Sequence, residues 1–227
     1  MFDGFYLFEW VLMTLGVILF VVLVIAFFYQ LVHKRSIAAL LAFFVLDIAM
    51  IGYPSLKSLE IQGGLVTIEK ETNAVLRDPG NTQARAELQQ QVDKLGQRSF
   101  SQPTNLTAIS KAEFALGNEP AAKTKLDKAL QRNPDLQQAQ QLKTKIENLD
   151  RLAPLTAKVE SNPADENAKA ELAQTLKVVN QQPVANPSAL LKVARAQAAL
   201  GDRENAEKNA AIVRKINPGL LVNAPHQ

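Results

Sequence analysis

Two copies of one phrase decide the fold of this chain: DPGNTQARAEL at residues 78–88 and NPADENAKAEL at residues 162–172. The copies lie 84 positions apart, and the match continues around them without a gap. Aligning residues 67–136 with 151–220 gives 19 identities in 70 positions. The same alignment pairs residues that mark helix boundaries: Pro103 with Pro187, Gly117 with Gly201 and Pro134 with Pro218. A match at a fixed offset indicates an internal duplication, so each copy is expected to be one structural unit that stacks on the other.

Each copy carries the start and stop signals of α-helices. In the first copy, a polar start at Asn81 or Thr82 opens a helix that is expected to end near Leu95. Two more helices then meet at Gly117, because glycine suits the left-handed residue that ends a helix. The pair closes at residues 133–134, since the proline there cannot continue the second helix. The pattern therefore predicts an all-α fold.

The copies are joined by further helical sequence. A helix over residues 136–149 and a second helix before Pro163 are expected to bridge them. We assign residues 67–150 to the first unit with its bridging helix, residues 151–220 to the second unit, and residues 221–227 to a tail. The whole domain is then expected to hold eight or nine antiparallel helices.

The first 53 residues differ in composition, because they hold twelve of the 14 aromatic residues. Residues 10–29, WVLMTLGVILFVVLVIAFFY, contain no charge and would span about 30 Å as a helix, which is the thickness of one hydrocarbon core. Residues 36–53 contain one charge and form a second candidate span. Six residues separate the two spans, so we expect a tight transmembrane hairpin over residues 1–53, followed by a linker over 54–66.

The orientation of this hairpin is predicted from its charges. Lys34 and Arg35 lie between the two spans, whereas the segment before the first span carries Asp3 and Glu9. Basic loops stay in the cytoplasm, so the turn is expected on the cytoplasmic side. Both termini and the duplicated domain would then be extracytoplasmic, or periplasmic in a bacterial inner membrane.

Asp47 is the single charge in the second span. Intramembrane carboxylates are costly and mark either ion or proton pathways or contacts with other helices. No second ionisable side chain lies nearby in the span to relay a proton. We therefore favour a contact between Asp47 and a partner helix, and keep proton or ion handling as the alternative.

Composition excludes several classes of function. The chain has no cysteine, and its only histidines are His33 and His226, so metal sites of thiolate or imidazole ligands and cysteine or serine triads cannot be assembled. Gly63-Gly64 stands alone and makes no phosphate loop. The net charge of +3 is dispersed, without the basic stripe and stacking aromatics that nucleic-acid binding needs. We expect no catalytic residue, no cofactor and no metal.

The segments AISKAEFALGNEPAAKTKLDKALQRNP and KVARAQAALGDRENAEKNAAIVRKINP resemble tetratricopeptide repeats, most clearly over residues 104–134 and 188–218. They share the Leu-Gly turn, the small alanine early in the second helix and the closing Asn-Pro. The resemblance implies a short right-handed α-solenoid that binds protein or peptide on its concave face. It places Thr107, Lys111 and Phe114 of the first copy, and Leu191, Arg195 and Ala198 of the second, on that face.

Lys111 and Arg195 are equivalent under the 84-residue shift. As bases facing one groove they could receive a carboxylate or an acidic segment. The alternative interpretation is that both are ordinary solvated charges on helix surfaces, which is the usual place of lysine and arginine.

Three functions are compatible with these features. The first is a non-enzymatic scaffold or accessory subunit that docks in an inner-membrane complex through its hairpin and binds an extracytoplasmic protein or peptide through its solenoid. The second is a periplasmic chaperone or assembly factor, because two spans followed by a tetratricopeptide domain resemble proteins of cytochrome c maturation, although the loop between the spans is short here. The third is an ion- or proton-coupled membrane subunit that uses Asp47 and Glu9.

Overall fold

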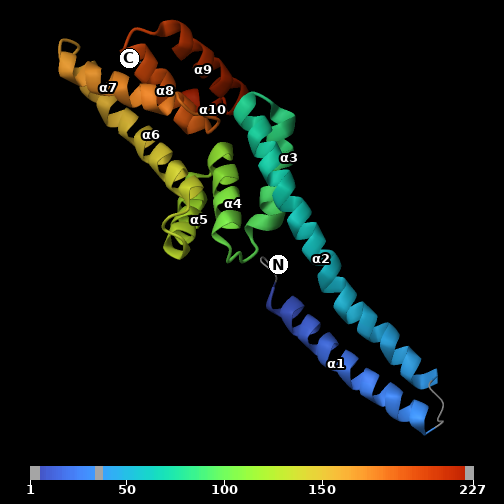
Figure 1. Cartoon of the computed structure of the whole chain (residues 1–227). Helices are drawn as coiled ribbons and strands as arrows, with labels where there is room; N and C mark the ends of the chain where they lie inside the picture. Colours follow the sequence, from blue (N-terminus) through green and yellow to red (C-terminus); the bar gives the residue numbers. More distant parts are fainter. Residues whose placement is uncertain (1–5, 34–37, 223–227) are drawn as a thin grey trace. The chain divides into compact units, whose positions relative to one another are not determined.

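The computed structural model describes residues 6–33 and 38–222, and within these ranges the chain forms ten helices and no strand (Figure 1). The predicted all-α class is confirmed. The helices are α1 (Leu7–Val32), α2 (Ala38–Arg77), α3 (Thr82–Gly96), α4 (Pro103–Leu116), α5 (Glu119–Arg132), α6 (Gln137–Ser161), α7 (Glu166–Val179), α8 (Pro187–Ala199), α9 (Arg203–Ile216) and α10 (Gly219–Val222).

The described chain divides into two compact units. Unit 1 runs to Gly64 and also includes Leu95–Ser101, the connection between α3 and α4. Unit 2 holds Leu65–Lys94 and everything described from Gln102 onward. Helix α2 therefore contributes its first part to unit 1 and its last part to unit 2.

In unit 1, α1 and α2 pack as a hairpin, and buried positions recur at intervals of seven residues along both helices. On α1 the buried residues are Glu9, Gly16 and Leu23. On α2 they include Leu40, Asp47, Pro54 and Ile61. A period of seven keeps one seam of a helix facing its neighbour, as in a coiled coil. A Cβ atom on Gly16 would lie 2.8 Å from Cγ1 of Ile51, so glycine permits the close approach of the two backbones at this point.

Helices α1 and α2 are both long and apolar enough to cross a membrane. The first predicted span, residues 10–29, lies inside α1, and the second lies in α2 from residue 38 onward. Residues 54–66, which we expected to be a linker, continue α2 as helix because buried Ser58 and Ile61 extend its seam. Lys34 and Arg35 lie outside the described residues, so the orientation of the hairpin stays a prediction.

In unit 2, the duplication is visible in the helix boundaries. Helices α3, α4 and α5 begin 84 residues before α7, α8 and α9. The side chain of Asn81 accepts a hydrogen bond from the Ala84 backbone N–H, and Asp165 caps Ala168 in the same way. The ends of α2 and α6 are also 84 residues apart. The last part of α2 is therefore the counterpart of the last part of α6.

The two copies form similar helix pairs, α4 with α5 and α8 with α9 (Figure 1). The turns within these pairs use Gly117 at φ 104° and Gly201 at φ 85°, a left-handed conformation in which other residues are strained. Small buried residues, Ala112 and Ala122 in the first pair, let the helices pack closely.

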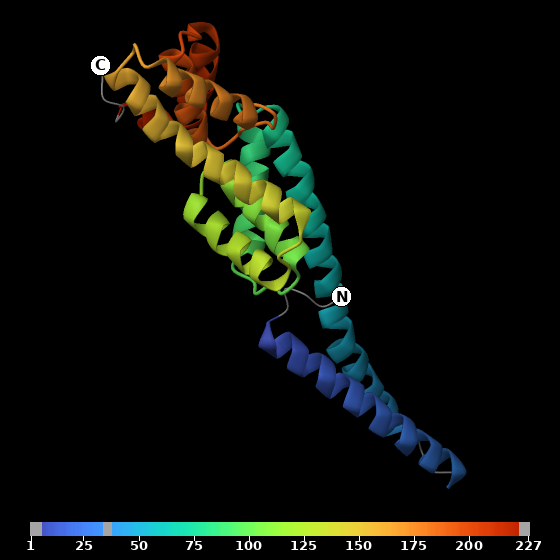
Figure 2. The same cartoon turned by 60° about the vertical axis from the view of Figure 1, so that its left-hand side comes forward.

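Helix α6 is a single helix, although the sequence predicted two helices between residues 136 and Pro163. It passes through Pro154, which removes one backbone donor. Buried leucines and valine on both sides of that proline, Leu149, Leu152 and Val159, hold α6 against its neighbours. Because α6 contacts α4, α5, α7 and α8, it is the element that joins the two copies (Figure 2).

Arg85 of α3 is a buried arginine that ties the copies together, since only 8% of it is exposed. Its Nε donates a hydrogen bond to the Pro79 carbonyl at 2.7 Å, and Nη1 donates to the Ala115 carbonyl at 3.3 Å. Nη2 donates to the carbonyl of Ala185, which precedes α8 in the second copy. One planar guanidinium therefore satisfies three carbonyls from three segments.

We predict that Arg85→Met lowers the free energy of unfolding by about 2–4 kcal/mol, because it leaves buried carbonyls without a donor. Lys169 is the matched control, since it is the counterpart of Arg85 in the second copy and pairs at the surface with Glu166. Lys169→Met should change stability by about 0.5 kcal/mol or less. Thermal and denaturant unfolding of the full chain in detergent measures the stability of both variants. Equal losses of stability in the two variants would contradict the role of Arg85 in joining the copies.

Candidate functional site

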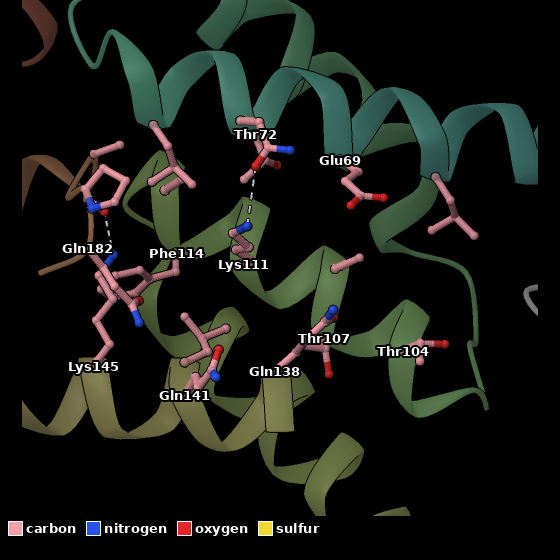
Figure 3. A pocket seen from close by; sticks show the side chains of 18 of the residues that line it. Glu69, Thr72, Thr104, Thr107, Lys111, Phe114, Gln138, Gln141, Lys145 and Gln182 are labelled. Atoms are coloured by element: carbon pink, nitrogen blue, oxygen red, sulfur yellow. Dashed lines mark hydrogen bonds between the residues drawn. The ribbon is translucent and has the colours of Figure 1, made fainter. Parts of the chain in front are cut away.

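Unit 2 contains a groove of about 990 Å³. The last part of α2 forms one wall, α4 forms the floor, and the start of α6 with the segment before α8 forms the other wall (Figure 3). Both apolar and polar side chains line the groove. Its lining includes Leu65, Val66, Leu76, Phe114 and Leu142 as apolar residues, and Glu69, Asn73, Arg77, Lys111, Gln138, Gln141, Lys145 and Gln182 as polar ones.

The three first-copy residues that the resemblance placed on a binding face, Thr107, Lys111 and Phe114, all line this groove. The Thr107 hydroxyl donates to the Pro103 carbonyl at 2.8 Å, and Phe114 is mostly buried in the core beneath. Lys111 is exposed, and its Nζ donates to Oδ1 of Asn73 on α2 at 3.4 Å (Figure 3). Their role in binding stays a prediction.

The three second-copy residues do not line the groove. Arg195 and Ala198 are exposed on α8, and Leu191 is half-buried. In the first copy the facing wall is α6, whose start corresponds to α10 in the second copy. Since α10 has only four residues, the part of the chain described here builds no comparable wall beside α8. Lys111 and Arg195 are therefore not brought together.

Lys145 is the groove residue that sequence reasoning missed. Burial and the nearby charge of Lys111 lower the pKa of Lys145 to about 8. Its Nζ donates to the Pro183 carbonyl across the groove wall (Figure 3). A signal was present in the sequence, because Lys145 lies three residues after Leu142 and four before Leu149, on the face of α6 that is otherwise apolar.

We predict that Lys111→Gln raises the pKa of Lys145, since it removes a repelling charge. The pH dependence of Lys145 acetylation, followed by mass spectrometry, measures that pKa. Lys143→Gln is the control, because Lys143 is exposed on the same helix and lines neither described hollow. An unchanged pKa in Lys111→Gln would contradict the proximity of the two ammonium groups.

The same group links stability to pH. The folded pKa of Lys145, about 8, lies below the unfolded value of 10.5, so the unfolded chain binds more protons between these limits. Stability should therefore rise with pH through this window, and Lys145→Met should flatten the rise. An anion bound beside Lys145 favours its charged form, so anion affinity should fall as pH rises above about 8.

Asp47 lies in the seam of the hairpin with 1% of its surface exposed. Along α2 it falls between two contacts with α1, the Phe20–Phe44 ring pair and the Gly16–Ile51 approach. Its Oδ1 atom has no hydrogen-bond partner among the described residues. The side chain thus faces α1 of its own chain, and a contact between Asp47 and another protein's helix stays a prediction.

Within the described ranges, no group of three histidine, aspartate or glutamate side chains is placed to hold a metal ion. Comparison with models of protein families, with curated proteins and with solved structures finds no match for this chain. The groove and the apolar hairpin are therefore the features that bear on the function of this chain.

Proposed function

We propose that this chain is a non-enzymatic scaffold or accessory subunit anchored in a bacterial inner membrane. Its two apolar helices dock among other membrane subunits. Its duplicated domain, a right-handed solenoid of the tetratricopeptide kind, binds a protein or peptide on the extracytoplasmic side. The groove of unit 2 is the place where that partner binds.

The observation that carries this proposal is the groove itself. Its volume of about 990 Å³ is at the upper end of the range of ligand pockets, and it opens between helices of a repeat, where repeat proteins bind their partners. The three first-copy residues selected by sequence lie in it together. Apolar positions offer area for burial, and amide and ammonium groups offer hydrogen bonds to a polypeptide.

The charges of the groove favour an acidic partner. The lining includes three basic residues, Arg77, Lys111 and Lys145, and Glu69 is its only carboxylate. The partly desolvated ammonium of Lys145 gains from an approaching anion, which restores the solvation that burial removed. Phe114 is the single aromatic residue in the lining, so the groove lacks the tryptophan and tyrosine anchors of tight interfaces. We therefore expect moderate affinity.

The test is purification of the tagged full-length protein in mild detergent, with co-purifying proteins identified by mass spectrometry. The proposal expects a stoichiometric set of membrane subunits together with at least one extracytoplasmic protein. A changing group of periplasmic clients would instead support the assembly-factor alternative. Purification of the chain alone would contradict both.

We predict that Lys111→Glu removes the extracytoplasmic partner and leaves the membrane subunits bound, because the charge reversal repels an acidic segment from the groove. Arg195→Glu is the matched control, since Arg195 is the exposed counterpart of Lys111 outside the groove. Loss of the partner in Arg195→Glu alone would move the binding site to α8.

A second prediction concerns docking in the membrane. If Asp47 contacts a partner helix, Asp47→Asn should keep the membrane subunits because the amide can still hydrogen-bond, whereas Asp47→Leu should release them. Blue-native electrophoresis of the purified complex reads both variants. Unchanged complexes in both would show that Asp47 serves only the seam with α1.

A further inference from the structure

The first turn of α1 contacts a corner of unit 1, which is formed by residues 57–61 of α2 and by the segment around Arg98. The backbone N–H of Tyr6 donates to Oε2 of Glu9 at 2.7 Å, which is a capping interaction at the start of the helix. Arg98, from the segment between α3 and α4, places Nη1 at 3.4 Å from the same oxygen. Its guanidinium also lies 4.7 Å from the centre of the Tyr6 ring. Glu9 is only 1% exposed, so this helix start is enclosed.

The opposite side of this corner is α2. Lys57 lies close enough to Arg98 for their charges to interact, and it pairs with Glu60 one turn further on. Ile61 follows as a buried residue of the seam. In unit 1, therefore, a corner made by residues 57–61 and the segment around Arg98 receives a helix start that carries an acidic residue.

An equivalent corner lies in unit 2. The aligned sequences pair Arg98 with Gln182. Counting back from the ends of α2 and α6, which lie 84 residues apart, the helix positions of Lys57 and Ile61 correspond to Gln141 and Lys145. Gln141, Lys145 and Gln182 line the groove, and all three also line a second hollow of about 510 Å³ between α6 and the end of α7. The equivalent corner is therefore open in the described part of the chain, and it is continuous with the groove.

We propose that this second corner receives the first turn of a helix from a partner protein, with an acidic residue at its third helical position, as Glu9 stands in α1. The proposal rests on the proposed function, because it takes the occupant to be a protein. The segment that docks beside the groove is therefore the start of a helix that carries a negative charge.

The chemistry of the corner fits such a helix start. The first turn of a helix leaves backbone N–H groups without acceptors, and the amide oxygens of Gln141 and Gln182 can accept from them. A bare helix N-terminus carries positive partial charge, which Lys145 would repel. An acidic residue in the first turn reverses that sign and can pair with Lys145, which stands at the position of Ile61 and supplies the positive charge that Arg98 supplies to Glu9 in the first corner.

The two corners differ in one respect that affects affinity. Arg98 offers a planar guanidinium that stacks on Tyr6, whereas its counterpart Gln182 is neutral. The helix start in the first corner belongs to the same chain, so it is always present. The helix start in the second corner comes from a partner protein and, with an amide in place of an arginine, dissociates more readily.

The probe is a labelled helical peptide of about 16 residues, long enough to hold helix in water, that begins Ser-Leu-Phe-Glu and continues in an alanine and lysine sequence. A second peptide carries Gln in place of that Glu. Fluorescence anisotropy with the full-length protein in lipid nanodiscs measures both. We expect the Glu peptide to bind roughly tenfold more tightly, as loss of one charge-assisted pair implies.

Variants of the corner sharpen the test. Gln182→Arg restores the arginine of the first corner and should tighten binding of the Glu peptide roughly tenfold without affecting the Gln peptide. Lys145→Met should weaken the Glu peptide by a similar factor, whereas Lys143→Met on the exposed side of α6 should not.

Equal binding of the two peptides, or no gain in Gln182→Arg, would overturn the helix-start inference. That outcome is distinct from failure of the proposed function. If the wild-type chain still co-purifies with its partner and Lys111→Glu still releases it, the groove binds protein and only the corner has been misassigned. If the wild-type chain captures neither peptide nor partner, both proposals fall.

Discussion

The seven-residue spacing of buried positions on α2 is the constraint on which the rest of the structure depends. Leu40, Asp47, Pro54 and Ile61 lie on it in unit 1, and Ile68 and Val75 continue it in unit 2. A stripe at this spacing must be covered along its whole length, by α1 at first and by helices of the duplicated domain later. The helix therefore continues through Pro54 and through a pair of glycines, although each of these residues weakens a helix.

Much of the fold could be predicted because its signals are local. Prolines, glycines and polar caps mark helix ends, and the 84-residue match shows that the signals occur twice, so the bounds of α3 to α5 and α7 to α9 were close to expectation. The failures have one cause. The linker expected after residue 53 and the break expected after residue 149 are both continuous helix, because buried residues on both sides of Pro54 and Pro154 continue α2 and α6, and tertiary packing outweighs one lost hydrogen bond.

Only three of the six candidate residues line one groove, for a related reason. Thr107, Lys111 and Phe114 share a groove because α6 lies opposite them, whereas Leu191, Arg195 and Ala198 have no such neighbour among the described helices. A pattern within one helix shows which residues share a face, but it does not show what stands across from that face. Lys145 was missed because its significance comes from α4 and from the segment before α8, neither of which is near it in sequence.

The copies also differ in how they join their paired helices. In the first, Glu113 pairs with Lys125 at 2.7 Å, and in the second the equivalent Gln197 and Asn209 form a neutral hydrogen bond at 2.8 Å. Glu113 is buried, so a carboxylate without its lysine would be a costly intermediate. A glutamine facing the lysine still accepts a hydrogen bond, and the longer lysine side chain reaches toward water. A stepwise exchange between the two pairs is therefore less costly through glutamine facing lysine than through glutamate facing asparagine.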